Sequence, residues 1–382
     1  MAWNDVIGQE RVKQILQNAF VQDRIASSYL FTGSEGIGKD ALAIEFAKLL
    51  NCPNPIFEID GQKSKAEITP EFDKKHKENA LFHQNIISVF GIPAPKPNSK
   101  DEVGLLSGLA DDQVKEIQEE LAKKSKDPYY KMNISGTLAI RVSQVRKVKQ
   151  ILKMSTPSNG KRVIIIFDAH TMNDESSNAL LKSIEEPADN TIFILITHSP
   201  DLILGTIKSR CQLIRFDPLK DAEIKKYLEL NNIGDKNNLD FILPFANGSI
   251  TRAIEFADED LQILRENTIE LLRNGLRKAN YREKTVGLVE SICSEKNRKN
   301  VQKSILLMAY WLEDCLKYSV GNKLIVNKDH EESIAKFTSV FGKKDIAKTI
   351  EYCEDSIRMV NQNVNIQMIY LSLIMKIRKV LL

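Results

Sequence analysis

The sequence predicts an α/β fold, a parallel sheet with helices on both faces, followed by an all-helical region. Two observations predict the sheet. Short apolar runs with little polar alternation, typical of strands buried on both faces, are interleaved with helical patterns as far as Pro218. The first of these runs, Ser28–Thr32, leads into a glycine-rich segment and then a helix. Beyond Pro218 the strand patterns disappear, which predicts the helical region.

The elements are expected in a regular order. An amphipathic helix over Val12–Phe20 comes first, from its apolar spacing of three and four. The predicted strands are Ser28–Thr32, Ile86–Phe90, Arg162–Phe167, Thr191–Thr197 and Gln212–Phe216. Helices are predicted over Lys39–Leu50, Val142–Met154 and Asn178–Glu186. This alternation indicates a three-layer α/β core. The charged runs Lys63–Glu78 and Asp111–Lys126 are interpreted as solvated helix faces or insertions.

Composition excludes several classes of protein. A length of 382 residues suggests two or three domains. A formal charge of +3 is nearly balanced, so any DNA contact must come from a local surface or a shared assembly. Five cysteines and five histidines are scattered without metal-ligand spacing, so neither a disulfide framework nor a metal site is expected. The polar N-terminus and the interrupted apolar run Ile366–Leu382 lack the pattern of a signal peptide or a membrane span, which favours a cytoplasmic protein.

A phosphate-binding loop is predicted at Gly33–Lys39, which matches GxxxxGK between a strand and a helix. Its glycines are Gly33, Gly36 and Gly38. Backbone N–H groups of such a loop surround phosphate oxygens, and the lysine, here Lys39, reaches the β- and γ-phosphates. A working loop continues with Ser or Thr, whose hydroxyl binds Mg²⁺. Asp40 stands there instead and brings negative charge to the phosphates, so the sequence predicts a degenerate nucleotide site.

A second departure follows the predicted strand Val163–Phe167. Asp168, at its end, is at the position of a carboxylate that binds magnesium. ATPases of this arrangement continue with a Glu that orients and deprotonates the attacking water. Ala169 stands in that position and cannot do either, and His170 is interpreted as structural. The fold is therefore expected to keep a phosphate-binding architecture without the residues for hydrolysis.

Five segments resemble the AAA+ clamp-loader family, in particular its delta-prime type in bacterial DNA polymerase III. They are Trp3–Glu10, Tyr29–Gly33, Asn178–Pro187, Phe193–Thr197 and Thr206–Gln212. The resemblance covers 1–52 and 137–216 well, the lid loosely, and the C-terminal region only by its helical character. It implies a RecA-like AAA+ domain at 1–217 with insertions at about 53–82 and 93–136, a helical lid at 218–262 and a helical collar at 263–382.

The resemblance also implies roles for single residues. Arg210, in Ser209–Cys211, is similar to an arginine finger that enters the ATP site of an adjacent subunit; the alternative is an arginine in a surface turn. Thr197 is at the position of the sensor 1 residue, and it either contacts the nucleotide or only ties the strand to its loop. In the region similar to sensor 2, Thr251 occupies the usual arginine position and Arg252 is displaced by one residue.

The implied function is that of a catalytically silent subunit that helps to load the sliding clamp onto primed DNA. Its implied partners are motor (gamma/tau) and delta subunits in a hetero-pentamer. An active gamma/tau-like ATPase and a stand-alone P-loop enzyme such as a nucleotide kinase are the alternatives. Related subunits carry a four-cysteine zinc module after the P-loop helix, and only Cys52 lies there. Neither zinc nor Mg-ATP is therefore expected as a resident cofactor.

Overall fold

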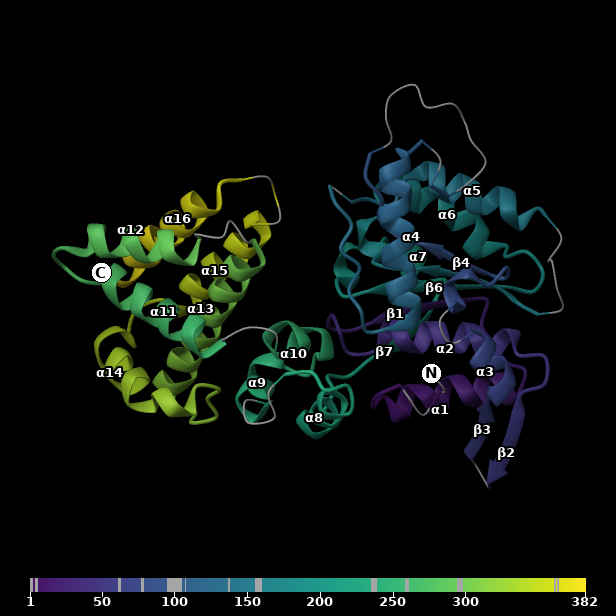
Figure 1. The fold of residues 1–382 in the computed structure, drawn as a ribbon, viewed down its shortest axis with the longest axis horizontal. Helices are drawn as coiled ribbons and strands as arrows, with labels where there is room; N and C mark the ends of the chain where they lie inside the picture. Colours follow the sequence, from purple (N-terminus) through teal and green to yellow (C-terminus); the bar gives the residue numbers. More distant parts are fainter. Residues whose placement is uncertain are drawn as a thin grey trace. The chain divides into compact units, whose positions relative to one another are not determined.

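The computed structural model describes residues 3, 6–60, 63–76, 79–94, 105–106, 108–136, 138–154, 160–234, 239–257, 261–293, 298–360, 362 and 364–382. The chain forms two compact units (Figure 1). The first contains residues 1–232 and 247–252, and the second contains 233–246 and 253–382.

The first unit is built on a five-stranded parallel sheet with the order β4-β5-β6-β1-β7. The strands are β1 (Ser28–Thr32), β4 (Ile86–Val89), β5 (Arg162–Ile166), β6 (Thr191–Thr197) and β7 (Gln212–Arg215). All five strands were predicted from the apolar runs, and the predicted α/β class is confirmed. In β1, Tyr29 is in register with Ile194 of β6 on one side and with Gln212 of β7 on the other.

Strand β7 departs from the prediction that every strand is buried on both faces. It is the last strand of the sheet, and only Ile214 in it is buried. Leu213 is 47% exposed. The prediction was wrong for this strand because a lack of alternation cannot distinguish a central strand from an apolar edge strand.

Helices cover both faces of the sheet (Figure 1). The helices of this unit are α1 (Glu10–Val21), α2 (Lys39–Asn51), α3 (Pro70–His76), α4 (Asp111–Lys126), α5 (Val142–Leu152), α6 (Asp174–Glu185), α7 (Gly205–Lys208) and α8 (Asp221–Leu230). Tyr29 of β1 packs edge-on against Phe46 of α2. The next residue, Leu30, joins a core with Val145 of α5 and Leu180 of α6. Because successive strand residues point to opposite faces, the two packings define the predicted three layers.

Two insertions extend this unit. An antiparallel hairpin of β2 (Ile56–Asp60) and β3 (Lys63–Glu67), which the sequence did not predict, precedes α3. The charged run Asp111–Lys126 forms α4 and is not only a solvated face, since Glu120 and Lys124 in it are buried. Of the insertion expected at 93–136, residues 95–104 and 107 lie outside the described residues.

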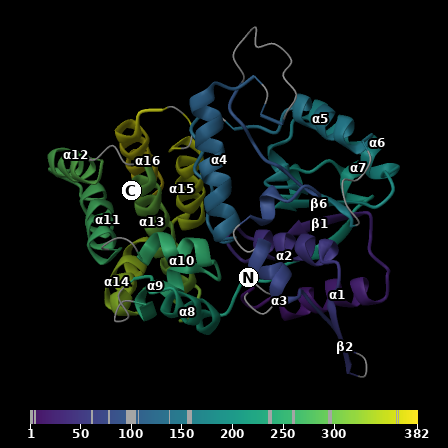
Figure 2. The same ribbon diagram turned by 45° about the vertical axis from the view of Figure 1, so that its right-hand side comes forward.

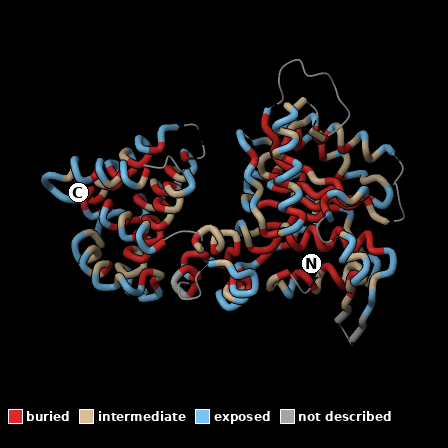
Figure 3. Tube along the Cα trace, in the orientation of Figure 1, coloured by how far each residue is buried: buried red, intermediate tan, exposed pale blue. Residues whose placement is uncertain are grey.

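The second unit is helical in its described residues. Its helices are α9 (Leu239–Ala246), α10 (Ile250–Ala257, which begins in the first unit), α11 (Leu261–Gly275), α12 (Tyr281–Ile292), α13 (Arg298–Ser319), α14 (Glu331–Phe341), α15 (Ile346–Val360) and α16 (Ile366–Leu381). Figure 2 shows them from a second direction. The predicted apolar stripe of α13 is buried from Val301 to Cys315 and packs against α11, α14 and α15 (Figure 3). Within the described residues, no helix has the length and apolar character needed to span a bilayer.

Candidate nucleotide site and exposed arginine

The P-loop connects the carboxyl end of β1 to α2. Gly33, Gly36 and Gly38 have φ angles of 144°, 74° and 98°, which side-chain-bearing residues rarely adopt. Lys39 is buried, and its ammonium donates to the carbonyl oxygens of Gly33, at 2.7 Å, and Ser34. Burial lowers the pKa of Lys39. The sequence-predicted loop is thus formed, with its lysine bound to the loop's own carbonyls.

The carboxylate of Asp40 already has a charged partner within the chain. Its Oδ2 lies 2.6 Å from Nζ of Lys124, a residue of α4 that is 4% exposed. The same ammonium donates to the carbonyl oxygen of Tyr130 at 2.8 Å. The carboxylate at the magnesium-binding position is therefore paired with a cation from the inserted helix.

A cavity of about 220 Å³ adjoins the P-loop. One wall is the loop and the start of α2, from Glu35 to Ala41, and another is the chain after α4, from Pro128 to Ile134. Cavities that bind drug-sized ligands measure about 300–1,000 Å³. The space beside the loop is therefore small, and the inserted chain forms one of its walls.

Asp168, Thr197 and two histidines meet where β5 and β6 end. Oδ1 of Asp168 lies 3.6 Å from Nδ1 of His198. Desolvation acts to raise the pKa of Asp168, but the interaction with His198 and the nearby charge of His170 bring it below its usual value. Oγ1 of Thr197 accepts the N–H of Ser199 at 3.0 Å and lies 3.2 Å from Nδ1 of His170. Thr197 thus ties its strand to the neighbouring loops, and the buried Ala169 supplies no base.

The sequence predicted no metal site, but the structure brings together one cluster of possible metal ligands. Asp168, His170 and His198 offer ligand atoms that all lie within 4.8 Å of one another, a set that could hold a divalent metal ion. His198 is far from the other two in the sequence, so their spacing gave no warning. The available signal was that both histidines follow neighbouring parallel strands, whose carboxyl ends share one edge of the sheet.

Arg210 lies in the turn between α7 and β7, with its side chain 40% exposed. Its Nε lies 2.8 Å from Oε1 of Glu185 at the end of α6, and its Nη1 donates to the carbonyl oxygen of Thr206 at 3.0 Å. Arg210 precedes β7, whereas the P-loop follows the parallel strand β1. A five-residue strand is about 16 Å long. The structure therefore brings Asp168 and Thr197 to the P-loop edge of the sheet but leaves Arg210 at the opposite edge.

Two family models match the chain. The model described as "DNA polymerase III, delta subunit" matches residues 8–220, and the one described as "DNA polymerase III, delta subunit, C terminal" matches residues 266–379. The chain belongs to this family. The resemblance to clamp-loader subunits of delta-prime type, stated above from five short segments, is thereby confirmed over most of the chain.

Curated relatives agree with this family. The chain is 22% identical over 366 residues to the DNA polymerase III subunit delta' of Bacillus subtilis, with 94% of this chain and 93% of that protein covered. It is 25% identical over 262 residues to subunit tau of the same organism, covering 67% of this chain but only 37% of tau. A 72-residue match to the delta' subunit of Pseudomonas aeruginosa, 19% of this chain and 22% of that protein, has 44% identity.

Solved structures resemble the chain more distantly. A DNA polymerase III gamma subunit-related protein from Thermotoga maritima has a TM-score of 0.44 and 15% identity, covering 97% of this chain and 98% of that one. The strand order and the family models, rather than this score, therefore support the fold class.

Proposed function

We propose that the chain is a delta-prime-type subunit of the DNA polymerase III clamp loader that hydrolyses no ATP itself and supplies Arg210 to the ATP site of an adjacent motor subunit. The observation that carries the proposal is the separation of two features within one sheet. The altered phosphate loop follows the carboxyl end of β1, and the exposed arginine precedes the amino end of β7.

The chain's own nucleotide site supports the first part of the proposal, that the chain hydrolyses no ATP itself. A working loop needs a hydroxyl next to its lysine to bind Mg²⁺, and here Asp40 is paired with Lys124. A working site also needs an acid or base near the γ-phosphate to activate water. Ala169, 1% exposed, occupies that position. Two of the groups that hydrolysis requires are therefore replaced.

The position of Arg210 supports the second part of the proposal, that this arginine acts at the ATP site of an adjacent subunit. An arginine side chain cannot span the about 16 Å of strand that separates the two edges. Its guanidinium is accessible and already fixed by Glu185 and by a backbone carbonyl. Because Arg210 cannot reach its own P-loop, the proposal assigns its guanidinium to a phosphate group bound by another subunit. Arginine fingers of this kind stabilise charge on the transferred phosphoryl group and contribute about 10³–10⁵ in rate.

The family supports a wider assignment, which is part of the proposal. The chain would join gamma/tau motor and delta subunits in a cytoplasmic hetero-pentamer that acts on the sliding clamp and primed DNA. The RecA-like domain would end near residue 217, residues 218–262 would form the lid and residues 263–382 the collar that holds the pentamer together.

The test is reconstitution of the pentamer with Arg210→Ala. DNA-stimulated hydrolysis at the adjacent site, followed in a single turnover, is expected to fall by about 10³-fold, while native mass measurement shows an intact pentamer. Arg146→Ala is the matched control, because Arg146 is also exposed and paired with a carboxylate, that of Glu175. Unchanged hydrolysis would remove the finger role. ATPase activity of the isolated chain that is lost in Lys39→Ala would favour the gamma/tau-like alternative.

A further inference from the structure

The turn after α4, Asp127–Lys131, contacts the P-loop pocket directly, and we call it the plug segment. We propose that the plug segment is a built-in ligand of the pocket, in which Tyr129 fills the place of a nucleotide base. The proposal rests on the function proposed above and deepens it, since it names what occupies the chain's own nucleotide site.

Tyr129 is held as a bound ligand would be. It is 4% exposed, and its hydroxyl oxygen accepts the backbone N–H of Ile7 at 2.8 Å. Its ring lies 5.3 Å from the ring of Tyr227 of α8. Its carbonyl oxygen accepts the hydroxyl of Thr251 at 3.2 Å. Three separate parts of the first unit thus converge on one residue, two on its side chain and one on its carbonyl oxygen.

The surroundings of the Tyr129 side chain would also suit a purine base. A purine base is a flat ring that carries acceptor atoms for a backbone N–H, and the Tyr129 ring with its hydroxyl oxygen offers the same two features. The ring also lies against the loop, because a Cβ added to Gly38 would be 3.4 Å from the Tyr129 hydroxyl. Tyr129 and a nucleotide bound in this orientation could not be present together.

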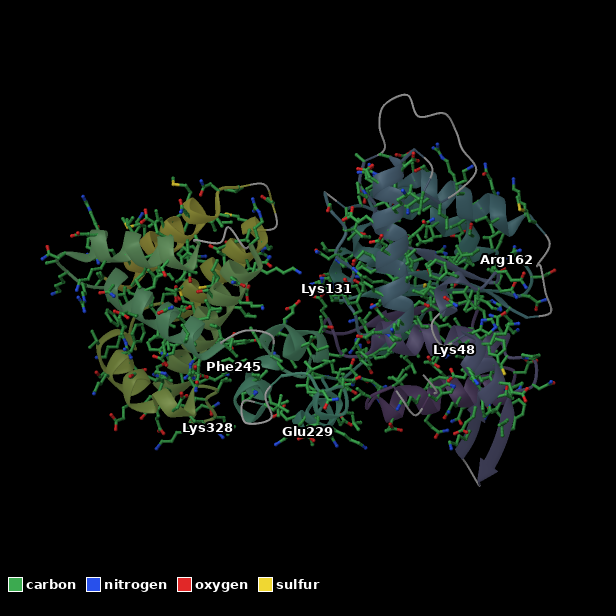
Figure 4. The ribbon with its side chains drawn as sticks, in the orientation of Figure 1. Lys48, Lys131, Arg162, Glu229, Phe245 and Lys328 are labelled. Carbon is green, nitrogen blue, oxygen red and sulfur yellow. The ribbon has the colours of Figure 1, made fainter. Side chains whose placement is uncertain are left out.

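The charged side chains of the P-loop also form ion pairs with lysines of α4 and the plug segment. Lys124, at the end of α4, pairs with Asp40 at 2.6 Å, and Lys131 pairs with Glu35 at 2.6 Å. Figure 4 labels Lys131 among the side chains of the first unit. Lys39 is bound to carbonyl oxygens of the loop. The groups that would otherwise meet phosphate and magnesium are therefore engaged by protein atoms.

The plug segment is held by hydrogen bonds to α4 and by one within itself. The hydroxyl of Tyr130 donates to Glu120 at 3.0 Å, and the side chain of Asp127 accepts the N–H of Tyr129 at 2.9 Å. Lys124 holds the carbonyl oxygen of Tyr130. Because these bonds lie within the insertion, the segment is preformed, and seating it costs little conformational entropy.

The experiment uses the full chain and three variants. Tyr129→Phe removes only the hydroxyl, and hydrogen exchange at the Ile7 amide is expected to accelerate about tenfold. Tyr130→Phe is the matched control, since its hydroxyl contacts α4 rather than the pocket, and Ile7 should exchange as in the parent. Tyr129→Ala empties the base position and is expected to bind a fluorescent Mg-ADP at least about tenfold more tightly than the parent.

Two results would overturn the plug. One is unchanged Ile7 exchange in Tyr129→Phe, and the other is a Tyr129→Ala chain that melts cooperatively yet binds the fluorescent nucleotide no better than the parent. Where Tyr129→Ala does not fold, the exchange of Tyr129→Phe decides alone. None of these measurements involves Arg210 or the other subunits. The plug can therefore fail while Arg210→Ala still lowers the pentamer's ATPase, and the reverse also holds.

Discussion

The ion pair between Asp40 and Lys124 makes a quantitative prediction about stability. The side chain of Lys124 is 5% exposed and that of Asp40 is 34% exposed. Removing one partner of a fully buried pair costs about 3–5 kcal/mol, whereas exposed pairs contribute about 0–1 kcal/mol. Since water reaches a third of Asp40, we expect an intermediate cost. Asp40→Ala should lower the free energy of unfolding by about 2–3 kcal/mol, because it leaves the buried ammonium with little more than a carbonyl partner.

The matching change Lys124→Met should cost less, about 1–2 kcal/mol, because the abandoned carboxylate can turn toward water. The double variant should lose less than the sum, with a coupling energy of about 1–2 kcal/mol. Urea titrations of all four chains measure it. In a Trp311→Phe background, the fluorescence of Trp3 reports unfolding of the first unit alone, since Trp311 belongs to the second.

The pair Arg146–Glu175 is the control for this cycle. Both side chains are more than 60% exposed and their closest N–O distance is 3.4 Å, so a coupling energy below about 0.5 kcal/mol is expected. If Asp40 and Lys124 couple no more strongly than this pair, the ammonium is not the structural counter-charge of the P-loop, and the reasoning about the pocket fails with it.

Two further predictions concern other parts of the chain. Glu185→Gln should leave the free energy of unfolding within about 0.5 kcal/mol but reduce the pentamer's ATPase several-fold, because Arg210 loses the partner at 2.8 Å that positions it; equal rates in both complexes would contradict this. In the second unit, the buried carboxylate of Asp314 accepts the backbone N–H groups of Val326 and Asn327 at 2.8–3.1 Å. Asp314→Ala should therefore cost about 2–4 kcal/mol, seen as a lower thermal midpoint, and a midpoint equal to the parent's would refute the role of this carboxylate.

The sheet could be predicted from the sequence because burial on both faces leaves a direct trace. Strands such as Arg162–Ile166 and Thr191–Thr197 are apolar at almost every position, and the fold leaves them buried at each one. The hairpin Ile56–Glu67 left no such trace, since it carries few apolar residues and Phe57 on it is 52% exposed. The available signal was the dipeptide Gly61-Gln62 between the two strands, because a glycine at the first position of a two-residue connection favours a tight hairpin turn.

The site was predictable only where residues adjacent in the sequence build it. Gly33–Lys39 and Asp168 follow their strands directly, so their positions at one sheet edge followed from the pattern. The contacts of Lys124 and Tyr129 did not, because the insertion shows neither a motif nor a periodicity that points toward the P-loop. Lys124 therefore belonged to a charged run that is usually solvated, and only its burial against Asp40 revealed its role.

The departure at position 40 and the insertion that follows β4 are best understood as one structural unit. A carboxylate beside a phosphate-binding loop repels the ligand the loop was shaped for, and on its own it would be a defect. Beside Lys124 it becomes half of an ion pair that joins α4 to α2. Replacing Asp40 by the threonine of a working P-loop would then not restore a nucleotide site. It would leave the Lys124 ammonium buried without its counter-charge, with Tyr129 still seated against Gly38. Under the proposed function, a loss of nucleotide binding and this gain of internal packing would be the same change.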